Sequence, residues 1–194
     1  MRYPLLRHIP NAITFARIAA LPVLIWMSFV DARQPFAYLM IACLVGDILD
    51  GLLARMLKVT SEFGAKLDSL ADALLLLVSA WGAWVFHEAA MREHAVAFAL
   101  VPGMFVAENI AALLRYGQLS SFHTLLSRVA AYALGIFIGI LFLVGYVVWL
   151  ADLAVGLLVV ATLEEFILLR MFPHWTANVG GVIRVLRQRR AAKP

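Results

Sequence analysis

Charged residues are scarce in this chain: 14% of its 194 residues are Asp, Glu, Lys or Arg, whereas 64% are hydrophobic. Soluble domains contain about 25% charged residues and are roughly half apolar, so this composition excludes a soluble globular protein. A single cysteine, Cys43, excludes a disulfide framework and a cysteine-based metal site. The mean hydropathy of +0.91 instead predicts an integral membrane protein.

Long apolar runs occupy most of the chain, and about 20 residues are enough for a helix to cross a bilayer. Because unpaired backbone groups cannot face lipid, we predict an all-α bundle of six transmembrane helices. The expected breaks carry proline, charged or polar residues, among them the His87–His94 stretch and Ala151-Asp152. The predicted crossings are 11–30, 36–53, 66–86, 96–115, 129–150 and 153–172.

The ends of the chain are basic. The first apolar run follows residues 1–10 without a small-residue cleavage site, so we expect a retained helix and not a signal peptide. The sequence thus predicts a basic juxtamembrane segment at 1–10, a transmembrane domain at 11–172 and a basic tail at 173–194. The tail has a basic and an apolar face, which is typical of a helix lying on an anionic lipid surface.

The distribution of basic residues predicts the orientation in the membrane. Of sixteen Lys and Arg residues, only Arg33 and Arg92 fall in the loops after the first, third and fifth crossings. We assign the others to the N-terminal part, the remaining loops and the tail. The positive-inside rule then makes both termini cytoplasmic, together with the loops at 54–65 and 116–128. The basic pI is explained by this topology, so we predict no nucleic-acid partner.

Four carboxylates lie within or beside the predicted second and third crossings, where ionisable residues are costly and functional by default. Asp47 and Asp50 are three residues apart, and Asp68 and Asp72 are four apart. Each pair therefore shares one face of its helix. A short connection makes the two helices antiparallel neighbours, so the four carboxylates can converge near the cytoplasmic boundary. Four unpaired carboxylates so close together would repel one another, and a divalent cation would relieve that repulsion. Because carboxylate oxygens are hard ligands, we predict a Mg²⁺ or Mn²⁺ site.

A simpler interpretation is that these aspartates cap helices or pair with Arg55, Lys58 and Lys66. It explains one or two carboxylates but not four at face-sharing spacings.

Small residues accompany the carboxylates. Gly51 and Ala54 share the face of the first pair, and Gly64 lies one turn before the second pair. They allow a bulky group or another backbone to approach closely, although ordinary helix packing explains each singly. Arg55 ends the second crossing where a guanidinium can bind phosphate. Metal ligands, an arginine and a small-residue approach together predict a diphosphate substrate.

The pattern from Asp47 to Asp72 resembles the signature of the CDP-alcohol phosphotransferase (CDP-alcohol phosphatidyltransferase) family. It reads Asp47-x-x-Asp50-Gly51-x-x-Ala54-Arg55, eight residues, Gly64, three residues, Asp68, three residues, Asp72, and all eight specified positions match. Ile9-Pro10-Asn11 with Thr14 and Arg17 is similar to the start of the first helix in family members.

The resemblance implies a fold and a reaction. Family members are six-helix bundles, usually homodimers, that transfer a substituted phosphate from a CDP-linked alcohol to a second alcohol and release CMP. Asp47, Asp50 and Asp68 would bind two metal ions, and Asp72 would be a further ligand or the general base. The residues implied to line the CDP site are Asp50, Gly51, Ala54, Arg55 and Gly64.

Donor and acceptor are less sharply indicated. The short chain resembles the branch that uses CDP-diacylglycerol, with the active site facing the cytoplasm of a bacterial inner membrane. The acceptor stays open between glycerol 3-phosphate, serine and inositol or its phosphate, since Ser69 favours the serine enzymes and the overall size favours the glycerol 3-phosphate enzymes. Arg115 and Arg128 could form an anion pocket for the acceptor, or simply anchor the helices at the interface.

Two other classes are alternatives. Membrane prenyltransferases bind Mg²⁺-diphosphate through two separated Asp-rich clusters, whereas here all four aspartates lie in one span. A cation transporter would place ionisable residues along the whole depth of the bundle, whereas these lie at one end. The sequence does not decide the roles of Glu108, Glu164 and Glu165.

Overall fold

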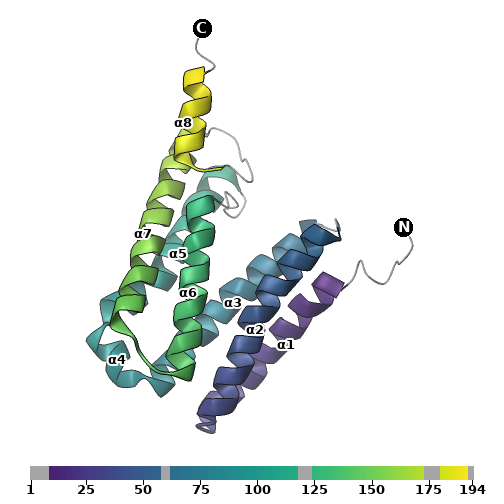
Figure 1. Ribbon diagram of the computed structural model, residues 1–194, viewed down its shortest axis with the longest axis vertical. Coiled ribbons are helices and arrows are strands. Elements are labelled where there is room, and N and C mark those ends of the chain that lie inside the picture. The colour runs from purple at the N-terminus through teal and green to yellow at the C-terminus, as the bar shows by residue number, and fades with distance from the viewer. Residues whose placement is uncertain (1–8, 58–61, 118–123, 173–179, 192–194) are drawn as a thin grey trace. The chain divides into compact units, whose positions relative to one another are not determined.

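The computed structural model describes residues 9–57, 62–117, 124–172 and 180–191, and the regular structure within these ranges is entirely helical. This confirms the predicted all-α class. Eight helices follow one another along the described chain (Figure 1): α1 Ile9–Phe29, α2 Arg33–Met56, α3 Glu62–Phe86, α4 Glu88–Glu93, α5 Ala95–Tyr116, α6 Leu125–Leu143, α7 Val148–Met171 and α8 Val182–Ala191.

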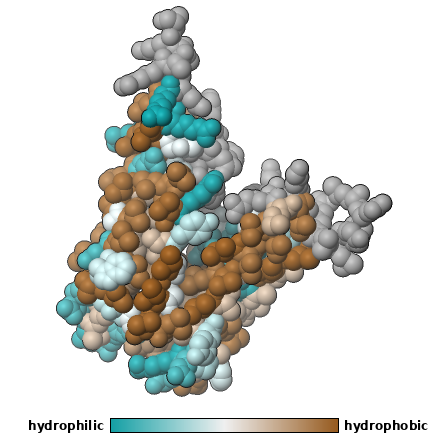
Figure 2. Space-filling model, viewed as in Figure 1, coloured by the Kyte–Doolittle hydropathy of each residue, from teal (hydrophilic) through white to brown (hydrophobic). Residues whose placement is uncertain are grey.

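Five of these helices, α1, α2, α3, α5 and α6, are long and apolar enough to cross a membrane. Helix α7 has 24 residues, a comparable length, but it carries the charged residues Asp152, Glu164, Glu165 and Arg170. Apolar side chains cover much of the helix surface in Figure 2. On α2, for example, Val45 and Ile48 are 47% and 50% exposed. Large side chains of this kind facing outward indicate a multi-pass membrane protein.

The predicted break at Ala151-Asp152 is wrong. Helix α6 ends at Leu143, and α7 begins at Val148. The backbone N–H groups of Val144 and Gly145 both donate to the carbonyl of Ile140, and Gly145 has a φ of +125°. Only glycine adopts that conformation without strain, so Gly145 ends the helix. Because the residues on both sides are apolar, the hydropathy pattern does not reveal this break.

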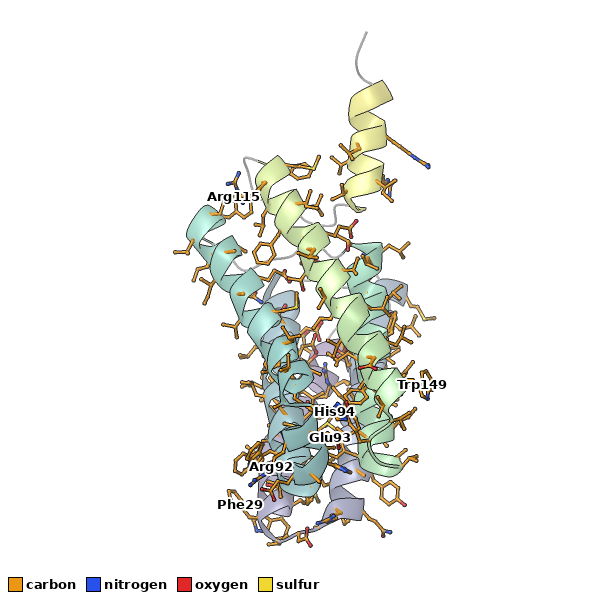
Figure 3. All side chains as sticks on the ribbon, turned by 90° about the vertical axis from the view of Figure 1, so that its left-hand side faces the viewer. Phe29, Arg92, Glu93, His94, Arg115 and Trp149 are labelled. Atoms are coloured by element: carbon orange, nitrogen blue, oxygen red, sulfur yellow. The ribbon has the colours of Figure 1, made fainter. Side chains whose placement is uncertain are left out.

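The charged stretch between the third and fourth predicted crossings contains one short helix, α4. Arg92 and Glu88 form an ion pair of 2.6 Å one turn apart on its exposed side, and Met91 is buried on the other. His94 follows α4 and occupies the position before the first residue of α5, whose opposite end carries Arg115 (Figure 3).

The described residues divide into two compact units. The first comprises those that fall within 1–93 and 138–146, and the second those that fall within 94–137 and 147–194. In the first unit α1 packs against both α2 and α3. The indole N–H of Trp81 in α3 donates to Ser28 Oγ in α1 over 2.8 Å. Gly82 makes room for the ring of Phe36, because a Cβ at that position would overlap it.

In the second unit α5 packs against α7, and α8 packs against the C-terminal part of α7. Their shared core contains Ala112, Leu168, Leu169 and Val185. Glu164 of α7 accepts a hydrogen bond of 3.0 Å from the backbone N–H of Val182, the first residue of α8. An acidic side chain therefore accepts from one of the free N–H groups at the N-terminus of the basic tail helix. This gives Glu164 a structural role that sequence reasoning left open.

Candidate metal centre

Helices α2 and α3 position the four predicted carboxylates. Asp47 and Asp50 lie on one face of α2, and Asp68 and Asp72 lie on one face of α3, as their spacings require. The structure brings all four together in the first unit. The element that joins them is α1, which packs against both helices and inserts one guanidinium group among the carboxylates.

Arg17 contacts every carboxylate of the cluster. Its Nη1 lies 2.9 Å from Asp47 Oδ1, 3.3 Å from Asp50 Oδ2 and 3.2 Å from Asp68 Oδ1. Its Nη2 lies 2.8 Å from Asp72 Oδ1. The bidentate geometry of a guanidinium lets a single side chain bridge two helices in this way.

The cluster has a buried base and an accessible rim. The side chains of Arg17 and Asp50 are 5% and 4% exposed, whereas those of Asp47, Asp68 and Asp72 are 39%, 41% and 48% exposed. A ligand can therefore reach the three outer carboxylates, while Asp50 anchors the cluster from below.

Thr14 supports the buried carboxylate from α1. Its Oγ1 lies 3.0 Å from Asp50 Oδ2 and 3.1 Å from the carbonyl of Pro10, one turn earlier in the helix. Because Thr14 and Arg17 are three residues apart, they share the face of α1 that meets the carboxylates.

Three carboxylates have the arrangement of a metal site. One oxygen from each of Asp47, Asp50 and Asp68 lies within 4.8 Å of the others. Oxygen-only ligands suit Mg²⁺ and Mn²⁺. The four carboxylates outnumber the one guanidinium that contacts them, so the cluster has an excess of negative charge that divalent cations can neutralise. The residues present therefore fit a metal centre, and Asp72 lies next to the group of three.

The structure describes the surroundings of two small residues of the motif, Gly51 and Gly64. A Cβ at Gly51 would meet no heavy atom within 4 Å, so the space beside this glycine is open. Gly64 is half-buried on the first turn of α3. Ala54 and Arg55 belong to the last turns of α2, but their side chains, like that of Lys66 and the whole of Lys58, lie outside the described residues.

The two arginines expected to bind the acceptor belong to the second unit. Arg115 donates to the carbonyl of Phe172 over 3.2 Å and lies above the ring of Tyr116. Arg128 belongs to the first turn of α6, where its backbone N–H donates to the carbonyl of Thr124. In the described structure Arg115 is thus engaged with the end of α7.

Sequence reasoning overlooked Arg17 as the partner of the aspartates and counted it with the N-terminal basic residues. The structure instead buries it inside α1. The available signal was a charged residue in the middle of an apolar helix, which by itself marks a functional candidate with a partner of opposite charge. Gly46 was overlooked as well: a Cβ there would lie 3.3 Å from Cδ of Arg17.

An accessible carboxylate cluster on apolar helices defines the chain as a multi-pass membrane protein with an acidic cluster that could hold a metal ion. The family model of the CDP-alcohol phosphatidyltransferases matches residues 7–164. The chain belongs to this family, which confirms the resemblance seen in the motif.

Curated relatives match a shorter stretch. The CDP-diacylglycerol–glycerol-3-phosphate 3-phosphatidyltransferase 2 of Arabidopsis thaliana is 39% identical over 71 residues, which are 35% of this chain and 30% of that protein. The enzyme of the same reaction name from Rickettsia bellii is 39% identical over 72 residues, 36% of this chain and 40% of that protein. A cardiolipin synthase (CMP-forming) of Oryza sativa is 36% identical over 76 residues, 38% of this chain and 23% of that protein. These matches span less than half the length of each relative, and no solved structure matches the chain.

Proposed function

We propose that this protein is a metal-dependent phosphatidyltransferase that transfers a phosphatidyl group from CDP-diacylglycerol to glycerol 3-phosphate and releases CMP. The observation that carries the proposal is the convergence of three carboxylate oxygens within 4.8 Å, from Asp47, Asp50 and Asp68, beside an accessible Asp72. Family membership supports the transfer reaction. It favours this reaction over the prenyltransferase and cation-transporter alternatives.

Each aspartate has a distinct task in this proposal. Asp47, Asp50 and Asp68 would hold two ions of Mg²⁺ or Mn²⁺. When bound, these ions supply neutralisation of the diphosphate and stabilise charge on the attacking and leaving oxygens. Asp72 takes the proton of the acceptor hydroxyl as its oxygen bonds to the phosphatidyl phosphorus and the bond from that phosphorus to CMP breaks.

The donor binds along the motif. Gly51, Ala54, Arg55 and Gly64, together with Asp50, are the proposed CDP-binding residues. The open space beside Gly51 supports this assignment, because a nucleotide can approach the α2 backbone there without displacing a side chain.

The acceptor is proposed from relatives. The curated names of two relatives with 39% identity specify glycerol 3-phosphate, which favours this acceptor over serine or inositol. Glycerol 3-phosphate carries a phosphate that a pair of guanidinium groups can bind, so Arg115 and Arg128 are the proposed acceptor-binding residues.

The proposed topology has six crossings: α1, α2, α3, α5, α6 and α7. Both termini and the carboxylate cluster face the cytoplasm of a bacterial inner membrane, residues 11–172 form the catalytic domain, and the protein is a homodimer. The basic tail that includes α8 lies on the lipid surface, where exposed Ile183 and Leu186 can enter the headgroup region between basic residues. Trp149, 67% exposed at the start of α7 (Figure 3), suits the opposite interface.

The test is CMP release by the purified protein in detergent. CDP-diacylglycerol is supplied with glycerol 3-phosphate, serine, inositol or inositol phosphate, with Mg²⁺ or Mn²⁺ and with excess EDTA. We expect CMP release with glycerol 3-phosphate, loss of activity in EDTA and recovery when the metal is restored. Full activity in excess EDTA would contradict the metal mechanism, and turnover with serine alone would contradict the acceptor.

A further inference from the structure

Arg17 occupies the position that the metal site requires. Its Nη1 lies within 2.9–3.3 Å of oxygens of Asp47, Asp50 and Asp68, the same three residues whose oxygens converge within 4.8 Å. A Mg²⁺ ion needs such oxygens at about 2.0–2.1 Å. A guanidinium nitrogen and a divalent cation cannot both lie at the centre of the same three carboxylates.

We propose that Arg17 is an internal counter-cation that competes with divalent metal ions for the carboxylate cluster, so that metal binding requires its guanidinium to move out of the centre. This inference rests on the proposed function, since it assumes that Asp47, Asp50 and Asp68 bind metal. It adds a residue outside the motif that determines how tightly and how readily the metal is taken up.

The charges explain why an internal cation is useful. Four carboxylates face one another within the apolar first unit, and the one guanidinium at their centre reduces their repulsion. Removal of a buried charged partner is strongly destabilising because the remaining charge is left uncompensated. Arg17 therefore stabilises the helix packing when metal is scarce, at the cost of weaker metal binding.

The surroundings of Arg17 show that its place is built into the fold. A Cβ on Gly46 of α2 would lie 3.3 Å from Cδ and 3.4 Å from Cγ of Arg17, so the absence of a side chain there leaves room for the arginine stem.

The guanidinium group of Arg17 does not use all of its hydrogen-bond donors. Arg17 Nε is buried without a hydrogen-bond partner among the described residues. Because a buried donor without an acceptor is unfavourable, this nitrogen lowers the free-energy cost of moving the guanidinium.

The experiment measures Mn²⁺ binding to the chelated full-length protein by electron paramagnetic resonance of the free ion. Arg17→Gln removes the charge, and Arg33→Gln is the matched control, because Arg33 is an exposed arginine that pairs with exposed Asp31 over 3.0 Å. We expect Arg17→Gln to bind Mn²⁺ about tenfold more tightly, equivalent to about 1.4 kcal/mol, and Arg33→Gln to bind it as the wild type does. We also expect Mn²⁺ to raise the unfolding temperature of Arg17→Gln more than that of the wild type, since the chelated variant lacks its internal cation.

A purely structural role for Arg17 makes the opposite prediction, because a distorted cluster binds metal more weakly. Wild-type or weaker Mn²⁺ affinity in Arg17→Gln would therefore overturn the proposal.

Should Arg17→Gln fail to fold, Arg17→Lys decides the question. A single ammonium group cannot reach both the three carboxylates at Nη1 and Asp72 at Nη2, so this variant should also bind Mn²⁺ more tightly than the wild type, and unchanged or weaker affinity would count against the proposal. Failure of the proposed function looks different: wild-type protein would then bind no Mn²⁺ or release no CMP, whatever residue stands at position 17.

Discussion

Thr14 Oγ1 of α1 lies 3.0 Å from Oδ2 of Asp50, the most deeply buried carboxylate of the cluster. A residue of the first helix, outside the sequence motif, therefore contacts the carboxylate cluster. Thr14→Val keeps the shape of the side chain and removes this contact. A hydrogen bond to a charged group contributes about 1.5–3 kcal/mol, so we expect half-maximal activity to need roughly tenfold more Mg²⁺ or beyond.

The measurement for this variant is a Mg²⁺ titration of CMP release. Thr162→Val is the control, because Thr162 is equally buried but belongs to the second unit. Equal Mg²⁺ requirements in the two variants would show that Thr14 does not support the site.

Substitution of Asp50 should abolish donor binding, whereas substitution of Asp72 should mainly lower turnover. Asp50 is the buried member of the three carboxylates that converge, whereas Asp72 is half-exposed and contacts Arg17 through the second guanidinium nitrogen. Asp72→Asn should lower turnover by a general-base factor of about 10²–10⁴ and keep CDP-alcohol binding in the presence of metal. Asp50→Asn should lose that binding. If both variants lose nucleotide affinity equally, Asp72 acts mainly as a ligand.

Gly51 offers a test of the donor site that leaves the packing intact. Since a Cβ there meets no heavy atom within 4 Å, Gly51→Leu should fold normally but block the approach of the nucleotide. The expected result is a raised KM for CDP-diacylglycerol with an unchanged unfolding temperature. Gly139→Leu is the control, because Gly139 also has open space beside it and belongs to α6. A similar rise in KM in both variants would remove the argument for Gly51.

Gly82, unlike Gly51, has no space for a side chain, so its substitution should lower the stability of the protein. A Cβ at this position would overlap the ring of Phe36, which packs against Phe86 with ring centroids 5.0 Å apart. Overpacking typically destabilises a core by about 1–3 kcal/mol, so Gly82→Ala should lower the free energy of unfolding in mixed detergent by that amount. Gly135→Ala, where no atom lies within 4 Å, should be neutral or slightly stabilising. Equal stabilities would indicate that the Phe36 ring moves away freely.

The proposed topology can be checked by cysteine labelling. The one native cysteine, Cys43, is buried, so Cys43→Ala provides a background without thiols. With a membrane-impermeant maleimide, Arg92→Cys should react only from outside the cell. Ser120→Cys, within the predicted 116–128 segment and outside the described residues, should react only from the cytoplasm. The reverse pattern would place the carboxylate cluster on the outer side.

Much of the site could be predicted from local spacing. Residues three or four positions apart share a face of their helix wherever that helix lies. The pairing of Asp47 with Asp50, and of Asp68 with Asp72, could therefore be predicted without knowing how the helices pack. The break at Gly145 could not be predicted in the same way, because it depends on a backbone conformation within an apolar run, and hydropathy does not change there.

The sequence by itself determined that this is a helical membrane protein with an acidic face on each of its second and third helices, because composition and helical periodicity are local properties of the chain. Only the tertiary structure decided what lies between those faces. Arg17 is 30 residues from Asp47 and 55 from Asp72 along the chain, so its contacts follow from how α1 packs against α2 and α3. Charge attraction makes the aspartates suitable partners for Arg17, but helix packing selects the single guanidinium that reaches all four.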